Sequence, residues 1–391
     1  MRPADVTIVV LAWNRRDETL ACLASLRRAD LRGARVLVVD NGSTDGTADA
    51  VRAAHPEASL LALPENRGYA GGNNAGIRAA LDDGAAAVLL LNNDTEVAPD
   101  FLPPLLDALA SGPEIGVVSS AILRMDRPEL LDVAWSEVQF GRRHVVQLVG
   151  TNALPGHGFD RRCEIQVAAG CSVLIRADVL RAVGLFDEAY FAYHEDVDWC
   201  LRVRAAGHRI VFEPFSRVFH RRSASTARPR PPGPSPGPRA AGVLPGDEPP
   251  PWNPVRTYLG ARNVIRLLRA HATARQKCAF LLACVRELPL ELLAVVWDRE
   301  GWMTLGRWDW AAAVRHGVLE RHPALHARAR GRVARAVVVA ALLPWTVLVA
   351  LPRDLWRAHR AGRLEQFAAT VRGLRDGYLR RPIPFARLGL R

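Results

Sequence analysis

Several common sequence features are missing from this chain of 391 residues, and each absence narrows the possible functions. The six cysteines form no CxxC pair and lie among apolar neighbours, so we expect free, buried thiols, a reducing compartment and no zinc site. The start, MRPADVTIVVLAWN, has no basic stretch followed by an apolar one, so we expect no signal peptide. A GxGxxG pattern and a Walker-type Lys are also missing, which disfavours a dinucleotide-binding fold and a P-loop.

The charge of the chain is uneven. Residues 1–255 hold 27 Lys and Arg against 31 Asp and Glu, whereas residues 256–391 hold 25 against 9. The net charge of +12 therefore comes entirely from the last third. This part alternates basic with apolar stretches and lacks the aromatic stacking platforms of single-strand binders. We expect an anionic membrane surface, and no nucleic acid, as its partner.

Apolar, β-rich runs alternate with helical patterns over the first 110 residues. Strands are predicted in 6–14 and 35–47, and helices in 16–29 and 48–55. Residues 59–83 predict a short strand, the glycine- and asparagine-rich loop NRGYAGGNNAGI (66–77) and a helix, and 85–109 predict a strand, a polar break and a helix. This alternation predicts βαβ units and a mostly parallel sheet. Ligands of such sheets bind outside the carboxyl ends of the strands, where polar clusters occur here at Asn14, Asp40 to Asp45, Asn66 to Asn74 and Asn92 to Asp94.

The rest of the chain divides into further segments. Residues 116–180 predict mixed structure with antiparallel strands, and 208–226 predict a strand pair ending in His220. We expect an α/β domain over 1–226, a disordered Pro/Gly-rich loop over 227–251, and a helical, basic and apolar region over 252–391.

Two segments of the last region are strongly apolar. Residues 278–297 contain Arg286, Glu287 and Glu291, so they predict an amphipathic helix rather than a membrane span. Residues 336–352 carry no charge over 17 positions, but Pro344 interrupts them. For this second segment a membrane span, an interfacial or re-entrant segment and a buried helix all remain open.

Three acids crowd the start of a predicted helix in HEDVDWCLRVRAAGHRI (194–210): Glu195, Asp196 and Asp198. One reason is structural, because acids in the first turn interact favourably with the positive end of the helix. Clustering three acids should also raise the proton affinity of at least one of them.

Other polar clusters are candidates for a nucleotide pocket. Asp40 in VVDNGSTDGT could accept a hydrogen bond from a nucleobase, or cap a tight turn. The glycines of 66–77 allow a close approach to a phosphate or sugar. Asp94 in LLLNNDTEV, placed beside a diphosphate, would be a candidate ligand for Mg²⁺ or Mn²⁺.

The order of these motifs resembles the family 2 glycosyltransferases, in particular a bacterial branch of rhamnosyltransferase- and galactofuranosyltransferase-like enzymes. The resemblance covers about residues 5–270. It rests on VVLAWN, VVDNGSTDGT, ENRGYAGGNNAGI, LLLNNDTEV, the stretch from GCSVLIRADVLRAVGLFDEAYF through HEDVDWC to SRVFH, and YLGARN. It implies the GT-A fold, an α/β fold with a mostly parallel central sheet flanked by helices.

The resemblance also assigns roles to individual residues. It implies Asp196 as the catalytic base, with Glu195 shaping the pocket. The family's DXD metal motif stands here as Asn92-Asn93-Asp94, so Asp94 would be the main ligand of the divalent metal, with Asn92 as a weak ligand and His220 completing the site. The implied donor-binding residues are Trp13, Asn14, Asp40, Asn66, Gly68, Gly72, Asn73 and Asn93. The implied acceptor-side residues are Gly170, Cys171, Asp198, Trp199 and Arg262.

These assignments predict an inverting transfer of a sugar from a dTDP- or UDP-linked donor to a glycan or polyprenyl-linked acceptor. We expect the enzyme at the cytoplasmic face of the cell membrane, as a peripheral or single-span protein in cell-surface polysaccharide synthesis. One alternative is a catalytically silent, membrane-tethered module that binds nucleotide sugars. Another, a nucleotidyltransferase, would need a basic phosphate loop near the N-terminus, which the sequence lacks.

Overall fold

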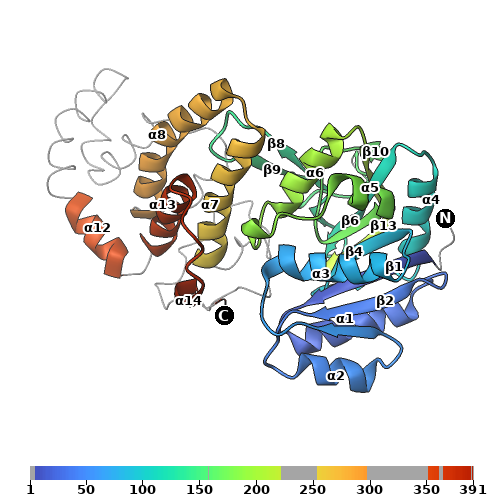
Figure 1. The fold of residues 1–391 in the computed structure, drawn as a ribbon. Helices are drawn as coiled ribbons and strands as arrows, with labels where there is room; N and C mark the ends of the chain where they lie inside the picture. Colours follow the sequence, from blue (N-terminus) through green and yellow to red (C-terminus); the bar gives the residue numbers. More distant parts are fainter. Residues whose placement is uncertain are drawn as a thin grey trace.

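A ten-stranded, mostly parallel sheet forms the centre of the N-terminal part of the molecule, and the C-terminal helices lie to one side of it (Figure 1). The computed structural model describes residues 5–156, 158–221, 253–296, 351–360, 364–388 and 390. The strand order is β10-β13-β6-β12-β4-β1-β2-β3, with β5 paired to β13 and β7 paired to β6. Within this path β12 and β10 run antiparallel to their neighbours and the other pairs are parallel, which confirms the predicted α/β fold with a mostly parallel sheet.

The strands of the large sheet are β1 Val6–Ala12, β2 Arg35–Asp40, β3 Ser59–Ala62, β4 Ala87–Asn92, β5 Thr95–Val97, β6 Ile115–Arg124, β7 Leu131–Val133, β10 Cys163–Glu164, β12 Ser172–Arg176 and β13 Arg209–His220. A second, three-stranded sheet contains β8 Trp135–Val138, β9 Val146–Val149 and β11 Val167–Ala168.

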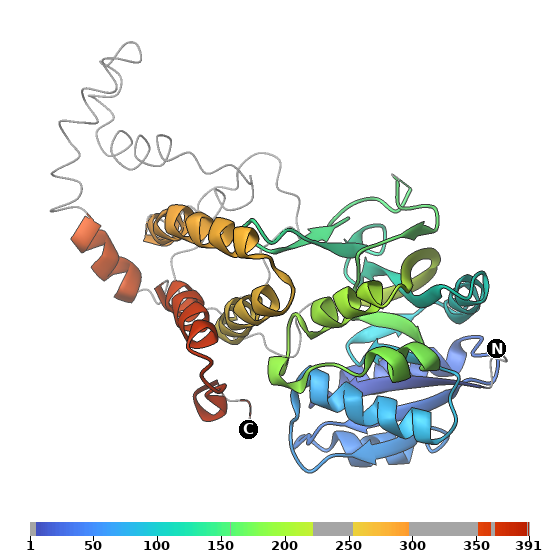
Figure 2. The same cartoon turned by 45° about the horizontal axis from the view of Figure 1, so that its top comes forward.

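The helices of the first part are α1 Arg16–Arg28, α2 Thr47–Ala54, α3 Gly68–Asp82, α4 Leu102–Ala110, α5 Ala177–Val183, the short 3-10 helix η2 Glu188–Tyr190 and α6 Glu195–Ala205. The described C-terminal residues form α7 Pro254–His271, α8 Ala274–Val296, α12 Leu351–Arg360, α13 Leu364–Tyr378 and α14 Phe385–Leu388, in agreement with the expected helical region. In both ribbon views α7 and α13 lie side by side, next to the segment that leads into α6 (Figure 2).

Hydrophobic layers cover both faces of the large sheet, because successive side chains of a strand point to opposite faces. On β1, Ile8 and Val10 join the layer beneath α1, α2 and α4, while Val9 and Leu11 join the layer beneath α3, α5 and α6. The second layer continues into α7 and α8, so this part of the C-terminal region shares the core of the sheet domain.

The prediction of a glycine-rich loop over 66–77 is wrong for most of these residues, because α3 already begins at Gly68. The glycines allow this helix to pack closely on the sheet. A β-carbon on Gly72 would overlap Leu11, and one on Gly76 would overlap Val9 and Val39.

Two further expectations concern strands and membrane segments. The described residues of the predicted strand pair, 208–221, contain a single strand, β13, whose pairing with β6 is irregular between Glu213 and Arg217. Among the described helices, α8 included, none combines the length and the apolar character needed to cross a membrane. The Pro/Gly-rich segment 227–251, and all but the last two residues of 336–352, lie outside the described residues.

Replacing Gly76 with Ala should destabilise the fold by about 1–3 kcal/mol, because the added methyl group meets the stiff side chains of Val9 and Val39. Urea denaturation followed by circular dichroism measures the effect. Gly156→Ala is the matched control, because a β-carbon there meets no atom within 4 Å, so its stability should stay unchanged. Equal stabilities of the two variants would contradict this packing role.

Candidate active site

The polar clusters predicted at the strand ends lie along one edge of the sheet. Ala12 of β1 is in register with Asp40 of β2, and Leu11 is in register with Asn92 of β4. Strand β12 runs the other way, so its first residue, Ser172, is opposite Leu91 at the same edge. Gly170 and Cys171, which precede β12, are thereby brought next to the ends of the parallel strands.

The turns after β1 and β2 are tied together by side chains of the predicted donor site. Asn14 receives a hydrogen bond at Oδ1 from the Thr44 backbone N–H (2.9 Å), and its own N–H donates to Ser43 Oγ (2.7 Å). Asp40 is buried and accepts from the Ser43 N–H (3.1 Å). Trp13 packs against a small apolar cluster that includes Phe191. Asn14 and Asp40 therefore shape the turns, as the turn-capping alternative for Asp40 implies.

Asn41, which the sequence analysis passed over, joins three parts of the donor side. It is almost fully buried, its Oδ1 accepts from the Arg67 N–H (2.9 Å), and its Nδ2 donates to Asn66 Oδ1 and to the Gly68 carbonyl (both 3.1 Å). The end of β2 is thereby fixed to the start of α3. In the sequence, the only indication of a role for Asn41 is its position directly after Asp40 in VVDNGSTDGT.

The other predicted donor residues lie on or beside α3 and β4, and the three asparagines among them form hydrogen bonds within the protein. Asn73 donates to the Tyr69 carbonyl one helical turn away (3.0 Å), and Asn93 donates to Thr19 Oγ1 of α1 (2.9 Å). Asn66 accepts from the Gly68 N–H (2.9 Å) at the start of α3. Gly68 has a positive φ of 71° and lies directly against Phe191.

Asp94 and His220, two of the predicted metal ligands, come together at this edge. His220 Nε2 lies 3.4 Å from Asp94 Oδ1, and its Nδ1 lies 2.7 Å from Asp132 Oδ2. Burial lowers the pKa of His220, but the two carboxylates outweigh this effect and raise it to about 9. Asp132, on β7, gave no signal in the sequence, because its neighbour in space is 88 positions away.

The third predicted ligand, Asn92, is held through its backbone. Its N–H donates to the Cys171 carbonyl (3.0 Å), and its carbonyl accepts from Thr95 Oγ1 (2.6 Å). Burial, with the nearby charges of Asp94 and Asp132, raises the pKa of the Cys171 thiol well above its ordinary range. The Cys171 thiol therefore stays protonated, and it does not act as a nucleophile.

Glu195 and Asp196 begin α6 and form a second acidic group. Gly170 approaches Asp196 so closely that a β-carbon on it would lie 3.0 Å from Asp196 Oδ2. Asp196 Oδ1 accepts from the Val197 N–H (2.8 Å). Glu195 is buried, and its Oε2 has no hydrogen-bond partner among the described residues. Burial raises the pKa of both groups, and the charge of Asp196 raises that of Glu195 further.

Tyr69 of α3 also reaches this acidic group, although the sequence analysis gave it no role. Its hydroxyl donates to the Gly170 carbonyl (2.5 Å). Burial, together with the charges of Glu195 and Asp196, raises the pKa of Tyr69 well above its usual value, so the phenol stays protonated. It is a polar group that can hold Gly170, and the position of Gly170 defines the space beside Asp196.

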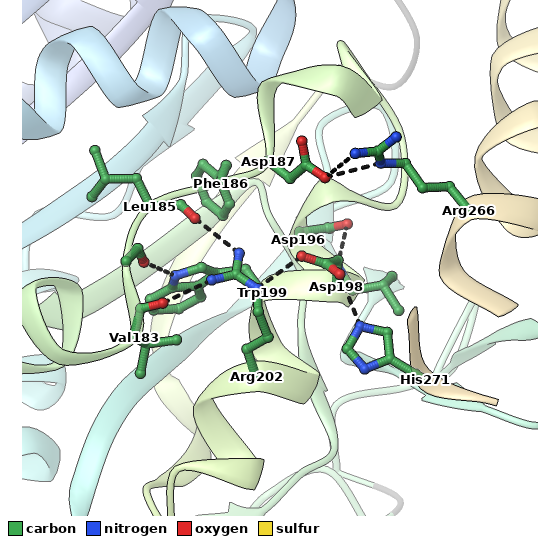
Figure 3. A network of polar contacts seen from close by, with 12 residues as sticks. Val183, Leu185, Phe186, Asp187, Asp196, Asp198, Trp199, Arg202, Arg266 and His271 are labelled. Carbon is green, nitrogen blue, oxygen red and sulfur yellow. Dashed lines mark hydrogen bonds and ion pairs between the residues drawn. The ribbon is translucent and has the colours of Figure 1, made fainter. Parts of the chain in front are cut away.

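Asp198 and Trp199 take structural positions on α6 (Figure 3). Asp198 accepts from His271 Nε2 (2.8 Å) and from Arg202 Nε (2.9 Å). Burial raises the pKa of Asp198, but these two partners outweigh it and the net shift is downward. Trp199 is 2% exposed and donates to the Gly184 carbonyl (2.7 Å), so it supports α6 from the core and offers no surface to an acceptor.

Arg262, the last predicted acceptor-side residue, lies on α7. Its Nη1 donates to the Ala189 carbonyl (3.0 Å) and to Asn263 Oδ1 (2.7 Å), and burial lowers its pKa. It therefore contacts the segment before α6. The neighbouring Asn263, within the same YLGARN motif, makes more contacts with that segment than Arg262 does.

Gly170 and Cys171 connect the two acidic groups. Asp94 and Asp132 lie close enough to Cys171 for their charges to act on its thiol, and Gly170 contacts Asp196. A ligand lying over these two residues would therefore have a carboxylate–imidazole group on one side and a proton-accepting carboxylate on the other. Such an arrangement suits a displacement in which one oxygen is deprotonated while an anionic group departs.

Comparison with known proteins identifies relatives of this chain. A family model described as Glycosyl transferase family 2 matches residues 7–182, up to α5. The N-acetylglucosaminyl-diphospho-decaprenol L-rhamnosyltransferase of Mycobacterium tuberculosis (strain CDC 1551 / Oshkosh) is 31% identical over 231 residues, which cover 53% of this chain and 72% of that protein. The dTDP-rhamnosyl transferase RfbF of Shigella flexneri is 22% identical over 258 residues, covering 66% of this chain and 76% of that protein.

A solved structure was also compared. The mannosyltransferase PcManGT from Pyrobaculum calidifontis, in complex with GDP-Man and Mn²⁺, superposes with a TM-score of 0.48 at 18% identity, over 95% of this chain and 87% of that chain. A likeness of this size carries no argument about function.

Replacing Asp198 with Asn should cost about 1.5–3 kcal/mol at pH 7, the usual range for a hydrogen bond to a charged group. Because the folded-state pKa of Asp198 is lowered, its contribution is complete above the unfolded pKa of about 3.9 and is lost as the pH falls through the folded pKa. The stability gap between wild type and variant in urea should therefore narrow from pH 7 to pH 3.

Asp49→Asn is the control for this measurement, because Asp49 forms an exposed ion pair with Arg52 on α2. It should change stability little at either pH. A gap for Asp198→Asn that is the same at pH 7 and pH 3 would contradict an ionised Asp198 in the folded protein.

Proposed function

The chain belongs to glycosyl transferase family 2 and is a glycosyltransferase, and we propose that it transfers a hexosyl group from a dTDP- or UDP-linked sugar to a glycan hydroxyl, with inversion at the anomeric carbon. The observation that carries the mechanism is the position of Asp196. It stands at the start of α6 beside Gly170, with its pKa raised by burial.

In this mechanism Asp196 takes the proton of the acceptor hydroxyl as its oxygen forms a bond to the anomeric carbon of the sugar. The bond between that carbon and the diphosphate oxygen breaks, and the nucleoside diphosphate leaves with the electron pair. A single displacement of this kind inverts the anomeric centre and needs one base within hydrogen-bond reach. Because burial raises the pKa of Asp196, the base is lost by protonation at a higher pH than for an exposed aspartate.

The residues at the other acidic group fit a divalent cation. Asp94 supplies a carboxylate oxygen, and Asp132 binds Nδ1 of His220, so Nε2 is the nitrogen that faces Asp94. A carboxylate behind a ligating histidine is a common arrangement in metal sites. No group of three or more His, Cys, Asp or Glu that could hold a metal ion occurs in the described part of the chain, so the donor phosphates would supply further ligands. When bound, Mg²⁺ or Mn²⁺ would neutralise charge on the departing diphosphate.

For the acceptor we propose a lipid-linked glycan at the cytoplasmic face of the membrane. The name of the M. tuberculosis relative describes an acceptor on decaprenyl diphosphate, which supports this choice. Two helices supply surface chemistry that suits a lipid headgroup region. Helix α8 exposes Leu281, Leu282 and Val285, and α12 exposes Trp356 beside Arg360.

Replacing Asp196 with Asn should lower turnover by about 10²–10⁴-fold, the usual contribution of a general base, and leave nucleotide binding unchanged. The purified protein is incubated with UDP-, dTDP- and GDP-sugars, Mn²⁺ and an extract of lipid-linked acceptors, and the released nucleoside diphosphate is measured. Asp178→Asn, an exposed acid on α5, is the control and should keep full activity.

Turnover that survives in Asp196→Asn would contradict the assignment of the base. A wild-type protein that binds nucleotides but releases none would instead favour the silent binding module.

Replacing Asp94 with Ala should weaken Mn²⁺ binding in the presence of a nucleoside diphosphate by tenfold or more, because it removes the carboxylate ligand (tenfold being about 1.4 kcal/mol). Electron paramagnetic resonance of free Mn²⁺ measures this directly. Asp100→Ala, an exposed acid in the same stretch, should leave binding as in wild type. Equal Mn²⁺ affinity in all three proteins would remove the metal role of Asp94.

A further inference from the structure

The segment between α5 and α6 has an unusual backbone just before the acids. Phe191, Tyr193 and His194 have positive φ values of 65°, 70° and 73°, although none of them is glycine. Residues other than glycine hold such conformations only where the surroundings enforce them. His194 is the N-cap residue of α6 and makes no side-chain capping bond, so the backbone before it sets where α6 begins.

Asn263 of α7 binds this segment at three points. Its side chain is fully buried, and Nδ2 donates to the carbonyl oxygens of Tyr190 (2.9 Å), Ala192 (2.9 Å) and Tyr193 (2.7 Å). Since an amide nitrogen carries two protons, the three carbonyls share them. The other end of the amide, Oδ1, accepts from Arg262 Nη1, so the orientation of the side chain is determined by its partners.

Other residues of α7 contact the same part of the molecule. Arg266 forms an ion pair with Asp187 and stacks over the ring of Tyr190, and His271 binds Asp198 of α6 (Figure 3). Residues 263, 266 and 271 recur at helical spacing, so one face of α7 follows the segment from its beginning into α6. Among these contacts, those of Asn263 fall on the residues with positive φ and on their immediate neighbours.

From these contacts we propose that Asn263 is a positioning residue for sugar transfer, which holds the backbone of 190–193 so that Asp196 meets the acceptor hydroxyl. The inference rests on the proposed function of Asp196. It extends the active site to α7, which lies beyond the residues that match the family model. Asn263 touches neither substrate nor reacting atoms and acts through the segment that it binds.

The side-chain chemistry of Asn263 is specific to this task. An Asp of the same shape would direct an oxygen at three carbonyl oxygens. An Ala would remove this donor from all three, although the Tyr190 carbonyl also accepts from the Ala192 N–H (2.8 Å). Either change releases the constraint on the residues with positive φ, and the start of α6 can then shift. A displacement of about 1 Å between a base and its substrate lowers a rate by about 100-fold.

The test compares Asn263→Ala and Asn263→Asp with Arg269→Ala in the full chain. Arg269 lies on the same helix but donates to the carbonyls of Gly377 and Tyr378 on the opposite side, so it controls for the docking of α7. Both Asn263 variants should lower kcat by about 100-fold, with unchanged nucleoside diphosphate affinity and donor KM. Arg269→Ala should keep the wild-type kcat.

A double-mutant cycle shows whether Asn263 acts through Asp196. In an Asp196→Asn background, Asn263→Ala should cause no further loss of the residual rate, because the base it positions is already absent. A full additional 100-fold loss there would overturn the proposal. So would a fall in kcat and in nucleotide affinity together, or two Asn263 variants that fail to fold while Arg269→Ala folds, because each points to a purely structural role.

Amide hydrogen exchange tests, without any turnover, whether Asn263 holds the backbone of 190–193, an action that we call the clamp. Peptides covering 186–198 should exchange faster in both Asn263 variants than in wild type, while peptides covering 35–47 should be unchanged. Identical exchange in 186–198 would overturn the inference even in an active enzyme. The two proposals can fail separately. If exchange is faster only in 186–198 and the Asp196→Asn variant retains turnover, the clamp is confirmed and the proposed base is refuted.

Discussion

The placement of the acids on α6 depends on one constrained stretch of backbone, residues 184–194. This segment is held from two sides. On one side Asn74 of α3 exchanges hydrogen bonds with the backbone N–H and carbonyl of Phe186, and Arg67 forms an ion pair with Glu188 (2.9 Å). On the other side Asn263 binds three carbonyls. Because the Arg67 N–H also binds Asn41, the end of β2 and the start of α6 belong to one connected polar network.

The electrostatics of the site follow from how each acid is partnered. Asp94 shares His220 with Asp132, and Asp198 is bound by His271 and Arg202, so positive groups balance these acids. Glu195 is buried and Asp196 is half-buried, neither has such a cation among its described contacts, and desolvation raises the pKa of both. The acids whose pKa is raised by desolvation are thereby distinct from the acids that pair with His and Arg side chains.

The local pattern of apolar and polar residues predicted the central parallel strands of the sheet. The apolar runs that became β1, β2 and β4, and the polar residues that follow them, are visible in the sequence because each depends on neighbours a few positions away. The pattern over 66–77 predicted a loop, whereas Gly72 and Gly76 lie in α3 and pack against Leu11, Val9 and Val39 of the sheet. Trp199 was predicted on the acceptor side, but an aromatic residue beside a cluster of acids can equally serve the core, where Trp199 lies.

The residues that the sequence analysis missed are those whose partners are distant along the chain. Asp132 meets His220 across 88 positions, and Asn263 meets Tyr193 across 70. Neither contact leaves a local spacing that could be recognised. Asn41 and Tyr69 were within quoted motifs, but only the fold reveals that their side chains bind Arg67 and Gly170.

The most direct test of this account is a crystal structure of the full chain with a nucleoside diphosphate and Mn²⁺. The account predicts the diphosphate and the metal at Asp94 and His220, with the open side of the site over Gly170 facing Asp196. A nucleotide bound away from these residues, or a diphosphate separated from Asp196 by the backbone of 168–172, would contradict a single site built from the two acidic groups.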